Sequence, residues 1–257
     1  MDLLEVPKTS FRRHPWEVAR ARFFRTTLQR AGALDSIASV LDVGAGDGYL
    51  SSALLESMPV GSRVTCLDPH YTADDVRRFA ASAAEAAVTF CTVRPKQRFD
   101  IILLLDVVEH VENDQQFVND YVSQNLAPDG VLLVSVPALQ LLFTQHDVGL
   151  KHFRRYSPRG LRTLLEDSDL TITKSGGLFH SPLFPRAVTA LRESLARRMG
   201  RPVAPSPHVG QWRGGPVMSN VVERCLMADN FLSAKASDLG WSLPGLSCWA
   251  LCRRKRQ

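Results

Sequence analysis

Short apolar runs bounded by turn residues recur along this chain, with polar or amphipathic stretches between them. Runs of this kind are typical of strands buried on both faces of a parallel sheet, whose crossover connections are helices. The pattern predicts seven strands, at residues 39–43, 63–67, 87–93, 99–105, 130–136, 170–174 and 247–253. The expected fold class is therefore α/β, a doubly wound, mostly parallel seven-stranded sheet with helices on both faces.

Helical periodicity fills much of the chain between and beyond these strands. Pro15 suits the first turn of a helix and predicts a helix over residues 14–30, lying across the edge or mouth of the sheet. In the second half, three stretches repeat apolar residues at helical spacing. These predicted helices cover residues 158–166, residues 182–199, where an apolar face stands opposite a basic one, and residues 217–232.

Composition and charge indicate whether the protein is secreted, membrane-spanning or intracellular. The N-terminus has no basic region leading into an apolar stretch, and nowhere do about 18 apolar residues run together, so neither a secretory signal nor a spanning helix is expected. Five cysteines, an odd number without a C-x-x-C pair, favour thiols in a reducing cytosol over a disulfide framework. The net charge of +5 comes partly from the basic tail at 253–256, which we interpret as a solvated end, with contact to nucleic acid or an anionic membrane surface as the alternative. We expect a soluble, cytoplasmic protein.

The turn after the first predicted strand carries the strongest chemical signal. It reads Asp42-x-Gly44-x-Gly46-x-Gly48 and runs directly into a helical pattern that begins at Tyr49. Glycines let the backbone turn sharply and approach a ligand, while a helix N-terminus presents unpaired N–H groups. A dinucleotide fingerprint would need a third glycine where Tyr49 stands. The carboxylate of Asp42 suits a ligand's ammonium group, which indicates a cationic, amino-acid-like cofactor.

This segment, VLDVGAGDGYL, resembles the first cofactor motif of class I S-adenosylmethionine-dependent methyltransferases, and the resemblance spans roughly residues 40–165. It implies a Rossmann-like domain that binds S-adenosylmethionine and releases S-adenosylhomocysteine. The resemblance assigns Asp68, which ends the second strand, to the ribose hydroxyls, whereas a plain Asp-Pro turn is the alternative. Thr92 is expected near the adenine. The residues expected to bind the cofactor are Asp42, Gly44, Ala45, Gly46, Gly48, Tyr49, Asp68, Pro69, Thr92, Asp106 and Val107.

The predicted elements divide one domain of 257 residues into three parts. Residues 1–35 form an N-terminal helical cap, residues 36–175 the cofactor-binding core, and residues 176–257 helical additions with the last strand. Residues 139–157 are rich in aromatic and titratable side chains, which predicts a functional loop. Residues 201–216 are rich in Pro and Gly and are expected to form an exposed loop.

Three titratable side chains, Asp106, Glu109 and His110, follow the fourth strand, at the edge where open α/β sheets bind ligands. In many methyltransferases this segment merely lines the cofactor's methionine and starts a helix. The segment is also similar to an acid-x-x-Glu-His motif of small-RNA 2′-O-methyltransferases and ubiquinone-pathway O-methyltransferases, which ligates a divalent metal with a later histidine. His152, or more weakly His146, would be that histidine, although Asp106 replaces the usual Glu. We assign no metal ligand and keep Mg²⁺, Mn²⁺ or Fe²⁺ as an alternative.

Methyl transfer to a hydroxyl also requires an aligned acceptor and removal of its proton. Because imidazole titrates near neutral pH, His152 is the first candidate base and His110 the second, with Glu109 the further catalytic candidate. Residues 154–156, Arg-Arg-Tyr, would clamp an anionic acceptor group or form salt bridges with carboxylates such as Asp147.

The function expected is S-adenosylmethionine-dependent O-methylation of a small or lipid-like acceptor of secondary-metabolite type. The helix at 182–199 and the aromatic residues Trp16, Phe23 and Phe24 would wall an apolar acceptor pocket, unless these residues are simply core. A lipid-like acceptor would go with peripheral membrane contact. A metal-assisted O-methyltransferase acting on RNA or a quinone-type phenol, and a non-catalytic regulator that binds S-adenosylmethionine, are the alternatives. Nucleic acid is disfavoured because no aromatic-basic RNA module is visible.

Overall fold

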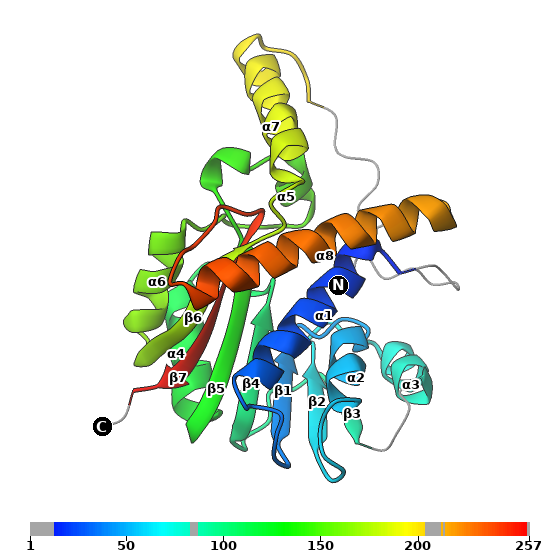
Figure 1. Ribbon diagram of the computed structural model, residues 1–257, viewed down its shortest axis with the longest axis vertical. Helices are drawn as coiled ribbons and strands as arrows, with labels where there is room; N and C mark the ends of the chain where they lie inside the picture. Colours follow the sequence, from blue (N-terminus) through cyan, green and yellow to red (C-terminus); the bar gives the residue numbers. More distant parts are fainter. Residues whose placement is uncertain (1–12, 83–86, 204–211, 213, 256–257) are drawn as a thin grey trace.

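The computed structural model describes residues 13–82, 87–203, 212 and 214–255. Its strands form one seven-stranded sheet in the order β3-β2-β1-β4-β5-β7-β6 (Figure 1). β7 is antiparallel to both of its neighbours, β5 and β6, and the other strand pairs are parallel. The strands are β1 Ser39–Val43, β2 Arg63–Leu67, β3 Val88–Cys91, β4 Phe99–Leu105, β5 Leu126–Pro137, β6 Leu170–Leu178 and β7 Ser247–Arg254. The predicted Rossmann-like fold class is confirmed.

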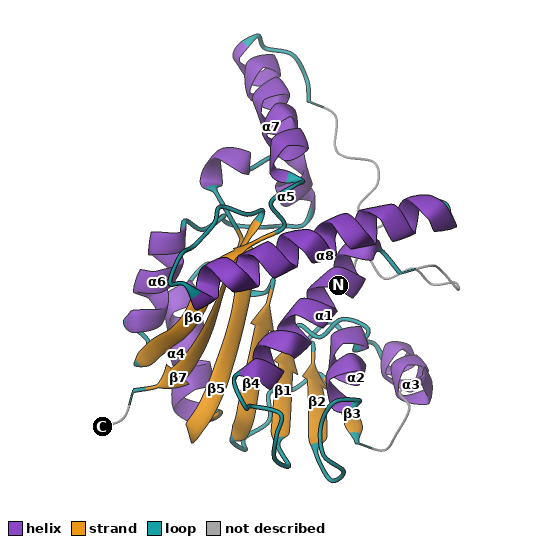
Figure 2. Cartoon of the chain, viewed as in Figure 1, coloured by secondary structure: helices purple, strands orange, loops and turns teal. Residues whose placement is uncertain are grey.

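Helices cover both faces of this sheet (Figure 2). They are α1 Pro15–Arg30, α2 Tyr49–Leu55, α3 Ala73–Ser82, α4 Asp114–Gln124, α5 Gln145–Gly149, α6 Pro158–Glu166, α7 Leu183–Arg198 and α8 Pro216–Asp238. The chain also forms two short 3-10 turns, η2 Val108–His110 and η3 Gln140–Leu142. None of the helices in the described part has the length and hydropathy that a bilayer span requires.

Alternate side chains of each strand enter two apolar layers, because successive residues of a strand point to opposite faces. On one face, Val40 and Leu103 pack with Phe24 and Leu28 of α1 and with residues of α2 and α8. On the other face, Leu41 and its neighbours pack with residues of α4 and α6. The two layers fix the carboxyl ends of the parallel strands at one edge.

The first helix departs from its expected place. His14 caps α1 by accepting the Trp16 N–H on Nδ1, and Pro15 begins the helix as predicted. However, α1 lies against one face of the sheet rather than across its edge, because Ala19, Phe24 and other apolar residues are fully buried there. Only its N-terminal half reaches the carboxyl edge of the strands.

Other boundaries also differ from the expectations. Residues 139–157 are not a plain loop, since they contain η3 and α5, and α5 is closed by a capping box between Thr144 and Asp147. α8 continues past residue 232 to Asp238, because Ser233 and Ala236 remain buried against the core. The third strand ends at Cys91, two residues early. Most of the loop expected at 201–216 lies outside the described residues.

Candidate functional site

A cleft of about 1020 Å³ opens at the carboxyl edge of the sheet. Predicted site residues from five separate segments line it together: Gly44, Asp68, Pro69, Thr92, Asp106, Val107, Glu109, His110 and His152. A small cavity adjoins the cleft and is lined by three further predicted residues, Asp42, Ala45 and Tyr49. These predicted residues therefore line two neighbouring spaces, which share Glu17, Arg20, Gly44 and Leu105 as lining residues.

The glycine turn after β1 shapes the floor of the cleft. Gly44 has φ +64°, and a Cβ there would lie 2.6 Å from Cγ2 of Val107. Gly48 has φ +73°, and a Cβ there would lie 2.8 Å from the Phe90 ring. Both positions combine the left-handed region with a close approach, so only glycine fits them without strain. Of the three glycines, Gly44 lines the cleft, whereas Gly46, at φ +57°, and Gly48 are buried and line neither the cleft nor the adjoining cavity.

Asp42 lies one residue before the end of β1, Asp68 directly follows the adjacent β2, and both side chains are buried. The Asp42 carboxylate accepts a 2.6 Å hydrogen bond from the Ser51 hydroxyl of α2. Burial raises the pKa of Asp42 to about 6, although the Ser51 hydrogen bond lowers it. Oδ1 of Asp68 accepts the His70 N–H at 2.9 Å. The two carboxylates can therefore face polar hydrogens of a ligand held over the turn.

Arg20 is a residue that sequence reasoning missed. It projects from α1, lines both the cleft and the adjoining cavity, and forms an ion pair with Asp106. Asp106 has φ +58° and accepts a 3.2 Å hydrogen bond from the Ser135 hydroxyl. No local sequence pattern indicates this ion pair, because its two partners are 86 residues apart in the chain.

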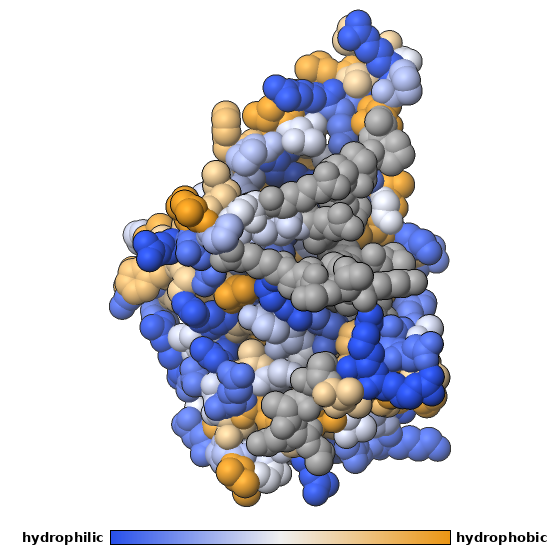
Figure 3. Space-filling view, turned by 90° about the vertical axis from the view of Figure 1, so that its right-hand side faces the viewer, coloured by the Kyte–Doolittle hydropathy of each residue, from blue (hydrophilic) through white to orange (hydrophobic). Residues whose placement is uncertain are grey.

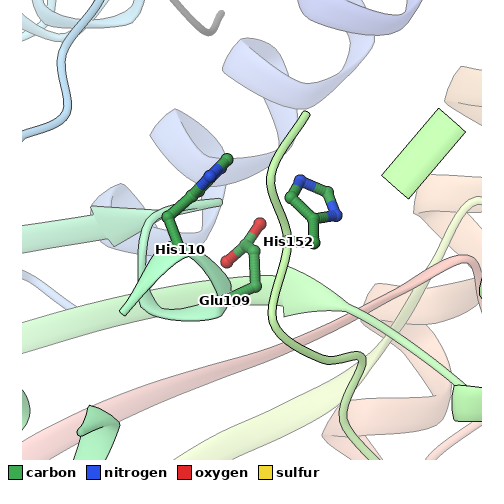
Figure 4. Close-up of side chains that lie close together, drawn as sticks. All are labelled: Glu109, His110 and His152. Atoms are coloured by element: carbon green, nitrogen blue, oxygen red, sulfur yellow. The ribbon is translucent and has the colours of Figure 1, made fainter. Parts of the chain in front are cut away.

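A buried carboxylate lies between two histidines at the far side of the cleft (Figure 4). Ligand atoms of Glu109, His110 and His152 lie within 4.8 Å of one another. Glu109 is completely buried, and neither carboxylate oxygen has a hydrogen-bond partner among the described residues. Burial raises the pKa of Glu109 well above its usual range, and the nearby charge of Asp106 raises it further. An unsatisfied carboxylate of this kind is costly unless a ligand completes it.

Local backbone structure brings these three side chains together. The η2 turn places Glu109 and His110 directly after β4. The carbonyl of Glu109 accepts the Phe153 N–H at 2.8 Å, which holds the segment carrying His152 alongside η2. The rings of His110 and His152 then meet edge to face, with centroids 4.6 Å apart.

Asp147, expected only as a salt-bridge partner of residues 154–156, also holds His152 in place. Its Oδ1 lies 3.0 Å from His152 Nδ1 and accepts the Arg155 Nε–H at 2.8 Å, while Oδ2 accepts from Arg186 Nη2 at 2.6 Å. Burial alone would raise the pKa of Asp147, but these partners, His152 first, hold it well below its usual range. The sequence signal was the Thr144-x-x-Asp147 capping pattern.

Several residues predicted to contact the methyl acceptor do not line the cleft. Phe23 and Phe24 do not wall the cleft, because they pack in the core, where the Phe23 and Trp249 rings lie 5.1 Å apart. Trp16 does line the cleft, but α7 contributes only Arg186 to it and leaves Leu191 and Leu195 exposed. Residues 154–156 form internal contacts rather than an anion clamp.

Each of the three side chains at 154–156 contacts a carboxylate of the protein itself. Arg155 pairs with Asp147, and Arg154 pairs with Asp114 at 3.0 Å. The Tyr156 hydroxyl donates to the same Asp114 carboxylate at 2.7 Å. The salt-bridge alternative is therefore confirmed.

Comparisons with known proteins agree with this geometry. The sequence model of a family described as "Methyltransferase domain" matches residues 16–175. A ubiquinone biosynthesis O-methyltransferase of Bradyrhizobium diazoefficiens is 29% identical over an alignment of 182 residues, and the alignment covers 64% of this chain and 70% of that protein.

Solved structures resemble the fold at low sequence identity. An S-adenosylmethionine dependent methyltransferase from Mesorhizobium loti has a TM-score of 0.52 and 13% identity, covering 85% of this chain and 92% of that one. The Burkholderia thailandensis 1,6-didemethyltoxoflavin-N1-methyltransferase, with bound S-adenosylhomocysteine, has a TM-score of 0.50 and 16% identity, covering 98% and 94%. At these identities the likeness shows the fold alone.

Proposed function

We propose that this chain, which belongs to the class I S-adenosylmethionine-dependent methyltransferase family, methylates a phenolic oxygen of a quinone-type acceptor. The observation that carries the proposal is the trio of Glu109, His110 and His152, set in the same cleft as the glycine turn. The relative from Bradyrhizobium diazoefficiens supports the acceptor class, since its name is that of an O-methyltransferase of ubiquinone biosynthesis. This is the quinone-type alternative of the sequence analysis.

The cofactor takes the glycine-turn side of the cleft in this proposal. The backbone at Gly44 and the neighbouring Val107 contact the methionine part of the cofactor. The Asp68 carboxylate accepts hydrogen bonds from the ribose hydroxyls. Arg20, at the junction of cleft and cavity, binds the α-carboxylate by exchanging its contact with Asp106. Asp42 supports the turn through Ser51 and adds negative charge near the ammonium group. The other predicted contacts are Ala45, Gly46, Gly48, Tyr49, Pro69, Thr92 and Asp106.

The trio has the donors of a divalent-cation site. One carboxylate and two imidazoles suit Mn²⁺ or Fe²⁺ and are compatible with Mg²⁺. The fit rests on Glu109, whose two buried oxygens have no hydrogen-bond partner in the described part of the chain. A bound cation would attract the acceptor hydroxyl and lower its pKa. Asp106 stands apart from the trio, because its carboxylate pairs with Arg20.

His152 is the group best placed to act on the acceptor proton. Asp147 lies 3.0 Å from Nδ1 and favours the tautomer in which Nδ1 carries the hydrogen. Nε2 then holds the lone pair, as either a cation ligand or a general base. Aligning the phenolic oxygen with the sulfonium methyl supplies much of the remaining rate.

Calorimetric titration of chelator-treated protein tests the proposal in two stages. S-adenosylhomocysteine should bind to the protein but not to an Asp68→Ala variant, and Mn²⁺ should bind to the protein but not to His152→Ala. His146→Ala is the matched control, because His146 also lines the cleft but lies outside the trio.

Turnover then identifies the acceptor class. Dihydroxylated aromatic acids with and without a prenyl chain should accept a methyl group on oxygen, as identified by mass spectrometry. Methylation of nitrogen or carbon in preference to oxygen, or equal Mn²⁺ binding by the His152→Ala variant, would contradict the proposal.

A further inference from the structure

The polarity of α7 is inverted relative to an ordinary surface helix. Its contacts with the protein body are polar: Arg186 pairs with the buried Asp147, and Glu193 accepts the Gln145 N–H at 2.9 Å. Ala190 is the buried hydrophobic residue of the helix. Since residues 186, 190 and 193 share one side of a helix, α7 turns the side that carries Arg186 and Glu193 inward, whereas Arg197, one turn further along, is exposed.

The opposite side of α7 is apolar and mostly uncovered, with Val188 half-buried on it. Phe184, Leu191, Leu195 and Met199, spaced at helical repeats, are 77%, 61%, 49% and 61% exposed. We call these four residues the α7 stripe. The helix projects away from the sheet (Figure 1), and orange residues lie among blue ones along this upper part of the molecule (Figure 3). A helix in water normally buries its apolar side against the core. Because the α7 stripe is not buried in this way, it is a candidate surface for binding another molecule.

The charges around the α7 stripe indicate which kind of partner binds it. Between residues 183 and 201 the chain has five arginines and one glutamate. Arg192 and Arg198 flank the stripe at positions one residue beyond Leu191 and before Met199, and both are exposed. Glu193, the single acid, faces inward and is held by Arg197 at 2.9 Å. The exposed surface of α7 is therefore apolar in the middle and cationic along its margins.

We propose that α7 docks on an anionic lipid bilayer, with the α7 stripe inserted below the headgroups. Arginine stems can lie along the acyl boundary while their guanidinium groups contact lipid phosphates. A second copy of the chain is a poorer partner, because two stripes packed face to face would bring Arg192 and Arg198 of both copies together.

Neighbouring exposed apolar residues support the same docking surface. η3 contacts α7, and Leu141 of η3 is 93% exposed. Val148 of α5, beside the Asp147 that holds Arg186, is 53% exposed. Both elements belong to the segment that also carries cleft residues such as His152. The proposal does not depend on the acceptor class, since it rests on surface residues outside the trio.

Flotation of the full chain with vesicles tests the docking. The protein should float with vesicles of phosphatidylcholine and phosphatidylglycerol and much less with phosphatidylcholine alone. Leu191→Ser with Leu195→Ser should lower the partition coefficient at least about tenfold, because two buried leucines are lost from the membrane. Arg192→Gln with Arg198→Gln should lower it as well, and added salt should weaken binding.

A matched pair of exposed apolar residues provides the control. Val217→Ser with Val221→Ser on α8, residues that are 78% and 51% exposed, should leave flotation unchanged. Equal loss in this control, or binding that survives both leucine substitutions, would overturn the proposal. A dimer seen by light scattering without vesicles and lost in the leucine variant would also overturn it, because the stripe would then be a self-association surface.

Discussion

Replacing Glu109 by methionine should stabilise the metal-free protein while it destroys the proposed cation site. The Glu109 side chain is completely buried with both oxygens unpaired among the described residues, and methionine fills a similar volume without a polar group. An unsatisfied buried polar group costs about 1–3 kcal/mol, and a charged one more. We therefore expect the free energy of unfolding to rise by about 1–3 kcal/mol, or roughly 2–4 °C in melting temperature per kcal/mol.

Thermal unfolding in chelator and in excess Mn²⁺ measures both effects. Mn²⁺ should raise the melting temperature of the unmodified protein, because a ligand that binds the folded state stabilises it, and it should not affect Glu109→Met. Glu112→Met, at an exposed position three residues away, should change stability by less than about 0.5 kcal/mol and keep the Mn²⁺ response. A Glu109→Met protein less stable than the original in chelator would refute the reasoning, since the carboxylate would then be satisfied in the folded state.

Three further predictions concern the residues around the cofactor and His152. Gly44→Ala should lower the free energy of unfolding by about 1–3 kcal/mol and abolish calorimetric binding of S-adenosylhomocysteine, because its φ is +64° and its Cβ would contact Val107. Burial raises the pKa of Asp42 to about 6, which favours its protonated form in the folded state, so stability measured by urea unfolding should fall by up to about 3 kcal/mol as pH rises from about 4 to 6. Asp42→Asn should flatten that decline, and a decline equally steep in the variant would exclude Asp42 as its source. Asp147→Asn should weaken Mn²⁺ binding by about 10–100-fold in calorimetry, because His152 loses the acceptor that fixes its tautomer; unchanged affinity would show that the contact is only structural.

The strands and the glycine turn could be predicted because their determinants are local. Each buried strand is a continuous apolar run, and the alternating glycines after Val43 sit in left-handed or crowded positions that other residues avoid. Short elements were missed because they lack a repeating apolar pattern: α5 has five residues and is stabilised by its capping box.

The site partners that could not be predicted are joined over long distances in the sequence. Arg20 reaches Asp106 across 86 residues, and Arg186 reaches Asp147 across 39. Each depends on how a helix docks, which periodicity alone does not determine. The pattern of α7 shows the limit most clearly, because it predicted the amphipathic helix but not that the charged side would face inward.

Asp147 connects the surface of the protein to the chemistry of the cleft. Its Oδ1 contacts the His152 ring, and its Oδ2 accepts from Arg186 near the start of α7. A buried carboxylate with cationic partners on both oxygens is lowest in energy only when all of them are in place, because a lost partner leaves charge unpaired in a poorly solvated region. Any force that displaces α7 from the body must therefore break the Arg186 contact or move Asp147, and moving Asp147 would move the His152 ring, which lines the cleft. The inverted polarity of α7 thus has a structural reason at its base: the inward arginine stabilises the carboxylate that orients His152.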